Sequence, residues 1–287
     1  MRAFAWIALG AAALLAGCSG MTRLAYNNAD LLLRKMANDY FDLDPVQSDE
    51  LKVRMRRFHA WHRANELPQY VAFLRTAERR FTKGLTAEDV AWAMSSARTR
   101  ARAFAAKAME EAAPLLAGLS QDQVSVLEKK LAENNARYVR ENLPGDERKR
   151  TRVQTRRMVD SFRQWTGDLT RDQEASVDRF VRAHDRFTTM RFEDRVRGQR
   201  EAVVLLRKRL PAKELAARLT QHFVDPDTRR TDDYLREEAR WEADFGKLLA
   251  ELSASLSPAQ RARVLRSIES YADDFALLAG ETRKAAA

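Results

Sequence analysis

The chain has 287 residues, of which 45% are hydrophobic and 32% are charged, and its formal net charge is +10. Ten glycines and seven prolines exclude a collagen-like or low-complexity chain, and the hydrophobic fraction excludes wholesale disorder. The single cysteine, Cys18, excludes an internal disulfide and any metal site built from several cysteines. The length suits one large domain or two small ones.

The first segment has the pattern of an export signal, with Arg2 followed by an uncharged apolar stretch over 3–16 that is too short to span a bilayer. It ends in Leu15-Ala16-Gly17-Cys18, which resembles the lipobox of bacterial lipoproteins. The resemblance implies a cleaved signal peptide over 1–17, with Gly17 and Cys18 flanking the cleavage point. It also implies a lipidated tether over 18–23 that begins with acylated Cys18. Ser19 stands where retained inner-membrane lipoproteins commonly carry Asp, which implies outer-membrane sorting. The alternative is an ordinary signal peptide that contains a buried thiol.

Beyond Cys18, apolar residues recur every three or four positions, and no sustained alternation of the kind found in strands interrupts them. This pattern predicts an all-α fold, an elongated array of antiparallel helical hairpins over 24–280, with a seam near 143–146 and a flexible tail over 281–287. The helices are expected near 24–41, 45–66, 68–82, 87–113, 120–142, 146–166, 171–208, 211–223, 227–252 and 258–279.

One motif marks many of the helix starts. Three segments read Leu-Ser/Thr-x-x-Gln, and two more are close relatives: 119–123, 169–173 and 256–260, then 43–47 and 85–89. A Ser, Thr or Asp at the N-cap can accept a hydrogen bond from the third amide, and a Gln there can bond back, forming a capping box. The connections are short, so consecutive helices should be antiparallel neighbours.

The Leu-Ser/Thr-x-x-Gln pattern is similar to the motif of the Spy and CpxP family of periplasmic helical proteins, and this likeness implies an ATP-independent chaperone or stress regulator. A second resemblance covers more of the chain. A family of uncharacterised lipoproteins from Gram-negative bacteria is suggested by segments that follow the lipobox: Tyr26-Asn27-Asn28-Ala29-Asp30, Asp39-Tyr40-Phe41-Asp42-Leu43-Asp44, His59-Ala60-Trp61-His62-Arg63 and Glu66-Leu67-Pro68-Gln69-Tyr70. This second resemblance implies a location and an architecture, and no known activity.

The candidates for chemistry are few. His59, His62 and Glu66 are spaced to share one helix face, and a zinc site with two histidines and a carboxylate is one interpretation. Ordinary hydrogen bonds of these histidines at a helix–helix contact are the preferred one. The chain has no Gly-x-Ser-x-Gly segment and no glycine-rich phosphate loop, so we expect no enzyme and no cofactor other than the lipid on Cys18.

The basic charge is concentrated in residues 146–209, which hold 18 basic and 11 acidic residues. A solvated helix face is the default interpretation, but arginine forks also bind phosphate and carboxylate groups. The lipobox places the protein outside the cytoplasm and therefore argues against nucleic acid. The expected partners are the membrane and anionic envelope components such as lipopolysaccharide or peptidoglycan, for which the protein would be a scaffold or adaptor. A Spy-like chaperone for unfolded envelope proteins is the alternative. The candidate anion-binding residues are Arg148, Lys149, Arg150, Arg152, Arg156, Arg157, Arg195 and Arg197.

Overall fold

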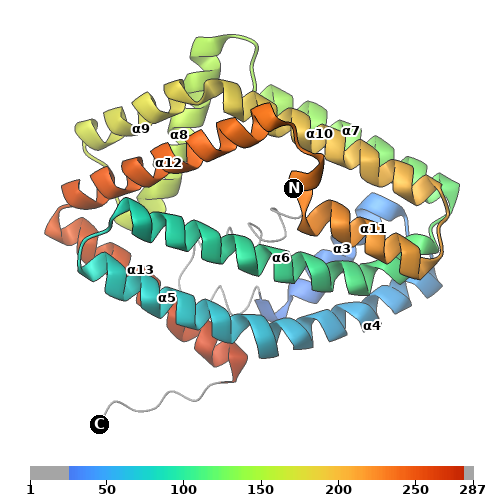
Figure 1. Cartoon of the computed structure of the whole chain (residues 1–287). Coiled ribbons are helices and arrows are strands. Elements are labelled where there is room, and N and C mark those ends of the chain that lie inside the picture. The colour runs from blue at the N-terminus through green and yellow to red at the C-terminus, as the bar shows by residue number, and fades with distance from the viewer. Residues whose placement is uncertain (1–25, 281–287) are drawn as a thin grey trace. The chain divides into compact units, whose positions relative to one another are not determined.

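The computed structural model describes residues 26–280, and within this range the chain consists of helices joined by short connections and contains no strand (Figure 1). The predicted all-α class is therefore confirmed. The predicted signal peptide, the lipidation site at Cys18 and the tail over 281–287 lie outside the described residues. The chain packs into two compact units, each assembled from three separate stretches of sequence. The predicted seam at 143–146 falls inside the second unit.

The first unit consists of the described residues up to Pro68, together with Thr99–Arg137 and Glu193–Arg229. It contains α3 (Ala29–Phe41), α4 (Pro45–Trp61), the π-helical turn η1 (His62–Glu66), α11 (Ala212–Val224) and the 3-10 turn η2 (Pro226–Arg229). It also takes the second part of α6 (Ala87–Ala117), most of α7 (Gln121–Asn142) and the second part of α10 (Asp185–Arg207). Leucine, valine and methionine side chains from α6, α7, α10 and α11 form its core.

The second unit consists of Gln69–Arg98, Tyr138–Phe192 and the described residues from Arg230 on. Its main elements are α5 (Leu67–Thr82), α8 (Glu147–Thr166), α9 (Arg171–Ala183), α12 (Asp232–Ser255) and α13 (Pro258–Ala279). α8 packs against α9 and α13, and α9 also packs against α12 (Figure 1). Two groups of buried apolar side chains form its core, one around Val177 and Phe180 and the other around Val264 and Ile268.

Most helices follow the predicted ranges closely, but the helix expected over 227–252 begins at Asp232, after the separate 3-10 turn η2. The helix expected over 171–208 is two helices, because His184 ends α9 with a φ of −121° and α10 begins at Asp185. α6 continues beyond its expected end at 113 to Ala117, with Pro114 inside the helix. The break expected between the helices over 45–66 and 68–82 is absent, because the π turn over 62–66 joins α4 to α5 without leaving the helical conformation.

The Leu-Ser/Thr-x-x-Gln segments and their relative at 43–47 form capping boxes, and these boxes pair. In the second unit, the Gln173 and Gln260 side chains donate to each other over 3.3 and 3.1 Å. The Gln260 side chain also donates to the backbone carbonyl of Asp168 over 2.7 Å, and the Gln173 side chain donates to that of Ser255 over 3.1 Å. Each of these carbonyls lies two residues before the N-cap of the partner's helix. The two capping boxes of the second unit therefore exchange equivalent hydrogen bonds, each glutamine binding the other and the backbone that precedes the other's helix.

The first unit repeats this arrangement with α4 and α7. Gln47 and Gln123 donate to each other over 3.1 and 2.6 Å. Gln123 also donates to the carbonyl of Asp42 over 3.0 Å, and Gln47 to that of Gly118 over 3.3 Å. Each unit thus contains one pair of glutamines that joins two helix starts far apart in the sequence.

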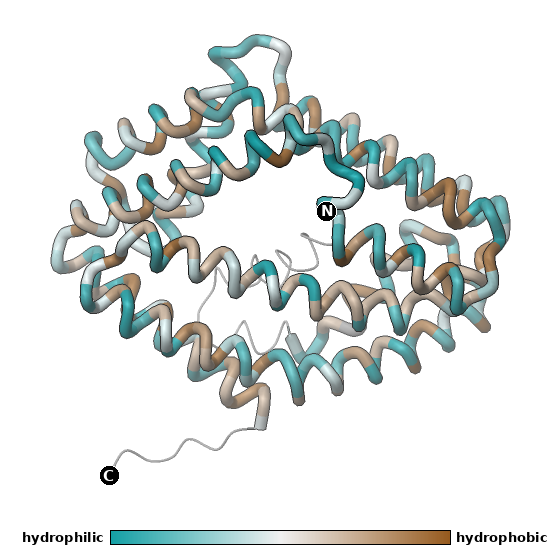
Figure 2. Tube along the Cα trace, viewed as in Figure 1, coloured by the Kyte–Doolittle hydropathy of each residue, from teal (hydrophilic) through white to brown (hydrophobic). Residues whose placement is uncertain are grey.

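Hydrophobic and hydrophilic residues are interspersed along the helices of the described chain (Figure 2). Among the described residues, no helix combines the length and the apolar character needed to cross a bilayer.

Candidate functional site

The most basic helix of the chain is α8, which carries seven basic and two acidic side chains. It begins where the Asp146 side chain accepts a hydrogen bond from the Lys149 amide over 2.7 Å, and it ends at Gly167, whose φ is 78°. Its buried face contains Thr151 and Val159. The basic residues occupy the remaining positions, so packing of the apolar face leaves most of them at the surface.

An open cleft of about 500 Å³ lies between α8 and α9 in the second unit. α8 contributes Arg148, Arg152 and Arg156, which are exposed and recur every four residues. In the described part of the chain, no carboxylate forms an ion pair with these three arginines. Thr155, Val159 and Arg163 also line the cleft from α8, and Glu174, Asp178 and Arg182 line it from α9.

The two carboxylates in the cleft already have partners. Arg163 donates to Glu174 over 2.7 Å, and Arg182 donates to Asp178 over 2.6 Å. Thr155 donates to the other Asp178 oxygen over 3.0 Å. The hydrogen bond from Arg182 holds the pKa of the Asp178 carboxyl below its usual range. The acidic wall is therefore compensated, while Arg148, Arg152 and Arg156 leave an excess of positive charge.

The structure divides the basic residues that the sequence groups together. Lys149 and Arg157 are exposed on α8 but do not line the cleft. Arg150 points elsewhere, since its guanidinium donates to both carboxylate oxygens of Asp185 over 2.7 and 2.5 Å and to the carbonyl of Pro144 over 3.3 Å. Its side chain is 18% exposed. Arg150 is thus a structural residue that ties α8 to the start of α10, and it is not part of the cleft.

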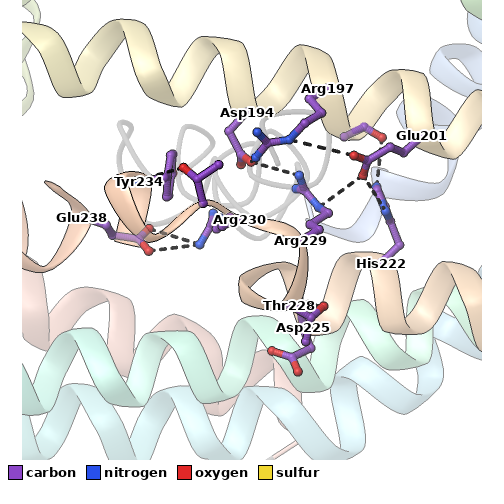
Figure 3. Close-up of polar contacts among 12 residues, drawn as sticks. Asp194, Arg197, Glu201, His222, Asp225, Thr228, Arg229, Arg230, Tyr234 and Glu238 are labelled. Atoms are coloured by element: carbon purple, nitrogen blue, oxygen red, sulfur yellow. Dashed lines mark hydrogen bonds and ion pairs between the residues drawn. The ribbon is translucent and has the colours of Figure 1, made fainter. Parts of the chain in front are cut away.

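Arg195 and Arg197 belong to the first unit, whereas α8 belongs to the second. Arg197 lies 2.6 Å from buried Asp194, which also binds Arg229 over 3.0 Å (Figure 3). Glu201 completes the group as an ion-pair partner of Arg197, Arg229 and His222. Arg195 is half-buried. Because Asp194 and Glu201 compensate its charge, Arg197 is not available as an open anion site.

His59 and His62 both contact Tyr26, whereas Glu66 faces an arginine. The Tyr26 hydroxyl and His62 Nδ1 are 3.0 Å apart, and the rings of Tyr26 and His59 pack at 4.5 Å. Glu66 is 2% exposed and faces Arg100 at 3.6 Å. Burial lowers the pKa of His62 to about 4 and raises that of Tyr26 to about 12. In the range that the structure describes, no three His, Cys, Asp or Glu side chains are placed to hold a metal ion.

Sequence reasoning identified the α8 side of the cleft and missed the α9 side. Glu174, Asp178 and Arg182 recur every four residues on α9, as Arg148, Arg152 and Arg156 do on α8. This shared spacing is visible in the sequence and could have indicated the residues. The sequence does not show that α8 faces α9, because tertiary packing decides which helices are neighbours. Tyr26 was also missed as the partner of His62, since 36 residues separate them.

The comparisons with known proteins place the chain in a family without assigning an activity. Residues 39–235 match the model of a family of unknown function, DUF6279, and the chain belongs to this family. This agrees with the expectation of an uncharacterised family. Searches of curated proteins and of solved structures gave no match.

Proposed function

We propose that this protein is an outer-membrane-anchored periplasmic lipoprotein that acts by binding, as a scaffold or adaptor for anionic components of the cell envelope. The observation that carries the proposal is the row of exposed, uncompensated arginines on α8 beside the cleft. Guanidinium groups bind phosphate and carboxylate through two parallel hydrogen bonds, so such a row suits a polyanion better than a neutral ligand.

The membrane location is supported by the lipobox at 15–18, whose Cys18 would carry the lipid anchor in this proposal. Two or more acyl chains suffice for stable anchoring. We expect radiolabelled palmitate to be incorporated in the wild type and lost in Cys18→Ala. Labelling that survives this substitution would contradict the anchor.

Binding is tested by cosedimentation of the full-length protein, in a neutral detergent, with peptidoglycan sacculi and with lipopolysaccharide. We expect binding that weakens as salt rises, because screening acts on exposed charge pairs. The variant R148A/R152A/R156A should bind less. The matched control is K52A/R56A/R57A, which removes three exposed basic residues of α4 that form no ion pair in the described chain. Binding that is insensitive to salt and to both variants would refute the proposal.

A chaperone like those of the Spy and CpxP family is the second candidate. The observation in its favour is that the Leu-Ser/Thr-x-x-Gln segments, which carry that resemblance, are built into paired helix starts in each unit. We would measure light scattering of an aggregating client protein. Suppression at a near-stoichiometric ratio would favour the chaperone, and unchanged aggregation would leave the scaffold as the better description.

A further inference from the structure

We infer that the cleft between α8 and α9 is a binding site for a ligand that carries two or more phosphate groups close together, either as soluble condensed phosphate or as a phosphorylated glycolipid headgroup. The inference rests on the proposed function, since both use α8, but it makes a narrower claim about chemistry and place. It assigns recognition to Arg148, Arg152 and Arg156 in one cleft, and it does not need the overall basic charge.

Charge is the first argument. The cleft is lined by five arginines and two carboxylates, and the carboxylates are bound to Arg163 and Arg182. The three remaining arginines leave a charge of about +3 to be matched. One phosphate group carries a charge of about −1.5 to −2 at neutral pH, so two phosphate groups match the cleft where a single one does not.

Spacing is the second argument. Arg148, Arg152 and Arg156 lie on successive turns of α8, which places neighbouring Cα atoms about 6 Å apart along the axis and the outer two about 12 Å apart. A single phosphate ion reaches one or two of these side chains. A ligand with several phosphate groups can give each guanidinium a bidentate partner, which is the geometry in which arginine differs most from lysine.

Preorganisation is the third argument. The opposite wall is held in place by the chain of hydrogen bonds from Thr155 and Arg182 to Asp178, so its acidic group does not compete for the three free arginines. The ion pair between Arg150 and Asp185 fixes the first half of α8 against the start of α10. The volume of about 500 Å³ lies within the range of small-ligand sites, roughly 300–1,000 Å³.

The test is isothermal titration of the full-length protein in neutral detergent with tripolyphosphate, orthophosphate and citrate. We expect tripolyphosphate to bind at least about tenfold more tightly than orthophosphate, because it offers at least one more charge-assisted hydrogen bond, which is worth a factor of about ten. Citrate should also bind more weakly than tripolyphosphate, because each carboxylate has two acceptor oxygens where a terminal phosphate group has three. The variant R148A/R152A/R156A should lose this preference, and R148K/R152K/R156K should regain only part of it. K52A/R56A/R57A is the control and should bind as the wild type does.

A second arm identifies the source of the phosphate. The acylated protein is placed in phosphatidylcholine vesicles that contain either lipid A, a glycolipid with two phosphate groups, or phosphatidylglycerol at equal charge. If tripolyphosphate binds more weakly in the lipid A vesicles than in the phosphatidylglycerol vesicles, the result supports a lipid-borne ligand. Equal binding in the two kinds of vesicle supports a soluble ligand.

The inference is overturned if citrate and tripolyphosphate bind equally, or if the α4 control loses as much affinity as the α8 variant. The proposed function would still stand in that case if R148A/R152A/R156A cosediments less than the wild type with sacculi or lipopolysaccharide. If the wild type binds neither the phosphate compounds nor the envelope polymers, both the inference and the proposed function are refuted. Circular dichroism and the unfolding midpoint confirm that each variant is folded.

Discussion

Arg150 and Arg152 are two residues apart on α8, yet their guanidinium groups have opposite surroundings. Arg150 forms a bidentate pair with Asp185 at 18% exposure, while Arg152 is exposed and lines the cleft. The same residue type in the same charged run therefore has a structural role at one position and a proposed binding role at the other.

We expect Arg150→Ala to lower the free energy of unfolding by about 2–3 kcal/mol, because it leaves the Asp185 carboxylate half-buried without its partner. Arg152→Ala should change it by less than about 0.5 kcal/mol, as is usual for an exposed side chain without a packed partner. Urea unfolding followed by circular dichroism measures both. Equal losses in the two variants would contradict the distinction.

His62 gives a prediction for pH. Its pKa in the folded protein is lowered to about 4 by burial, with a smaller contribution from His59, against an ordinary value of 6.5. Between these values the unfolded chain binds more protons than the folded one, so stability should fall as the pH falls from about 6.5 to 4. The slope from this residue is at most about 1.4 kcal/mol per pH unit.

The comparison variant is His62→Gln, which cannot titrate but can still hydrogen-bond the Tyr26 hydroxyl. We expect its denaturant midpoint to depend less on pH over this window than that of the wild type. A residual slope should remain, because burial also lowers the pKa values of His184 and His222. Identical slopes for the two proteins would show that His62 is not the group responsible.

At the scale of elements, the paired capping boxes make two helix starts dependent on each other. Gln173 and Gln260 are 3% and 9% exposed, and each caps its own helix while binding the other. Removing either side chain takes one hydrogen bond from the buried partner amide and leaves a backbone carbonyl of the partner's helix start without its side-chain donor.

We therefore expect Gln173→Ala and Gln260→Ala each to cost about 2–3 kcal/mol of unfolding free energy, and the double variant to cost about 1 kcal/mol less than their sum. A double-mutant cycle by urea denaturation measures this coupling. Gln47→Ala and Gln123→Ala are the internal control and should cost less, since those side chains are only half-buried. Strictly additive losses would show that the glutamines act separately.

The helices and their caps were predictable from the sequence because their causes are local. Ser257, Pro258 and Gln260 carry the signals for a helix start within four residues, and the structure places the start of α13 there. The pairing of Gln260 with Gln173 was not predictable, since any of the four other similar segments could have been the partner. The candidate site divides in the same way. The period of the α8 arginines is local, but the distinction between Arg150 and Arg152 depends on Asp185, 35 residues away.

At the scale of the whole molecule, the chain passes between its two units five times, at residues 68, 98, 137, 192 and 229. Neither unit is a continuous stretch of sequence. Cutting at 143–146, where the sequence predicts a seam, removes 193–229 from the first unit and 69–98 from the second.

We expect the fragments 1–143 and 144–287 to lack a cooperative thermal transition when each is produced alone, because each lacks part of the core of its unit. Coexpression should restore helicity and a cooperative transition. Circular dichroism and size-exclusion chromatography measure both outcomes. A fragment that melts cooperatively by itself would show that the cores close without the missing stretches.

The reciprocal glutamine pairs also constrain how this family can change over evolutionary time. A substitution at position 173 removes a partner from position 260, and the same holds for positions 47 and 123. Such a change is tolerated best when the partner position changes with it. Among relatives, the four glutamines are therefore expected to covary as two pairs, 47 with 123 and 173 with 260, and the helix starts that they join should be inherited together.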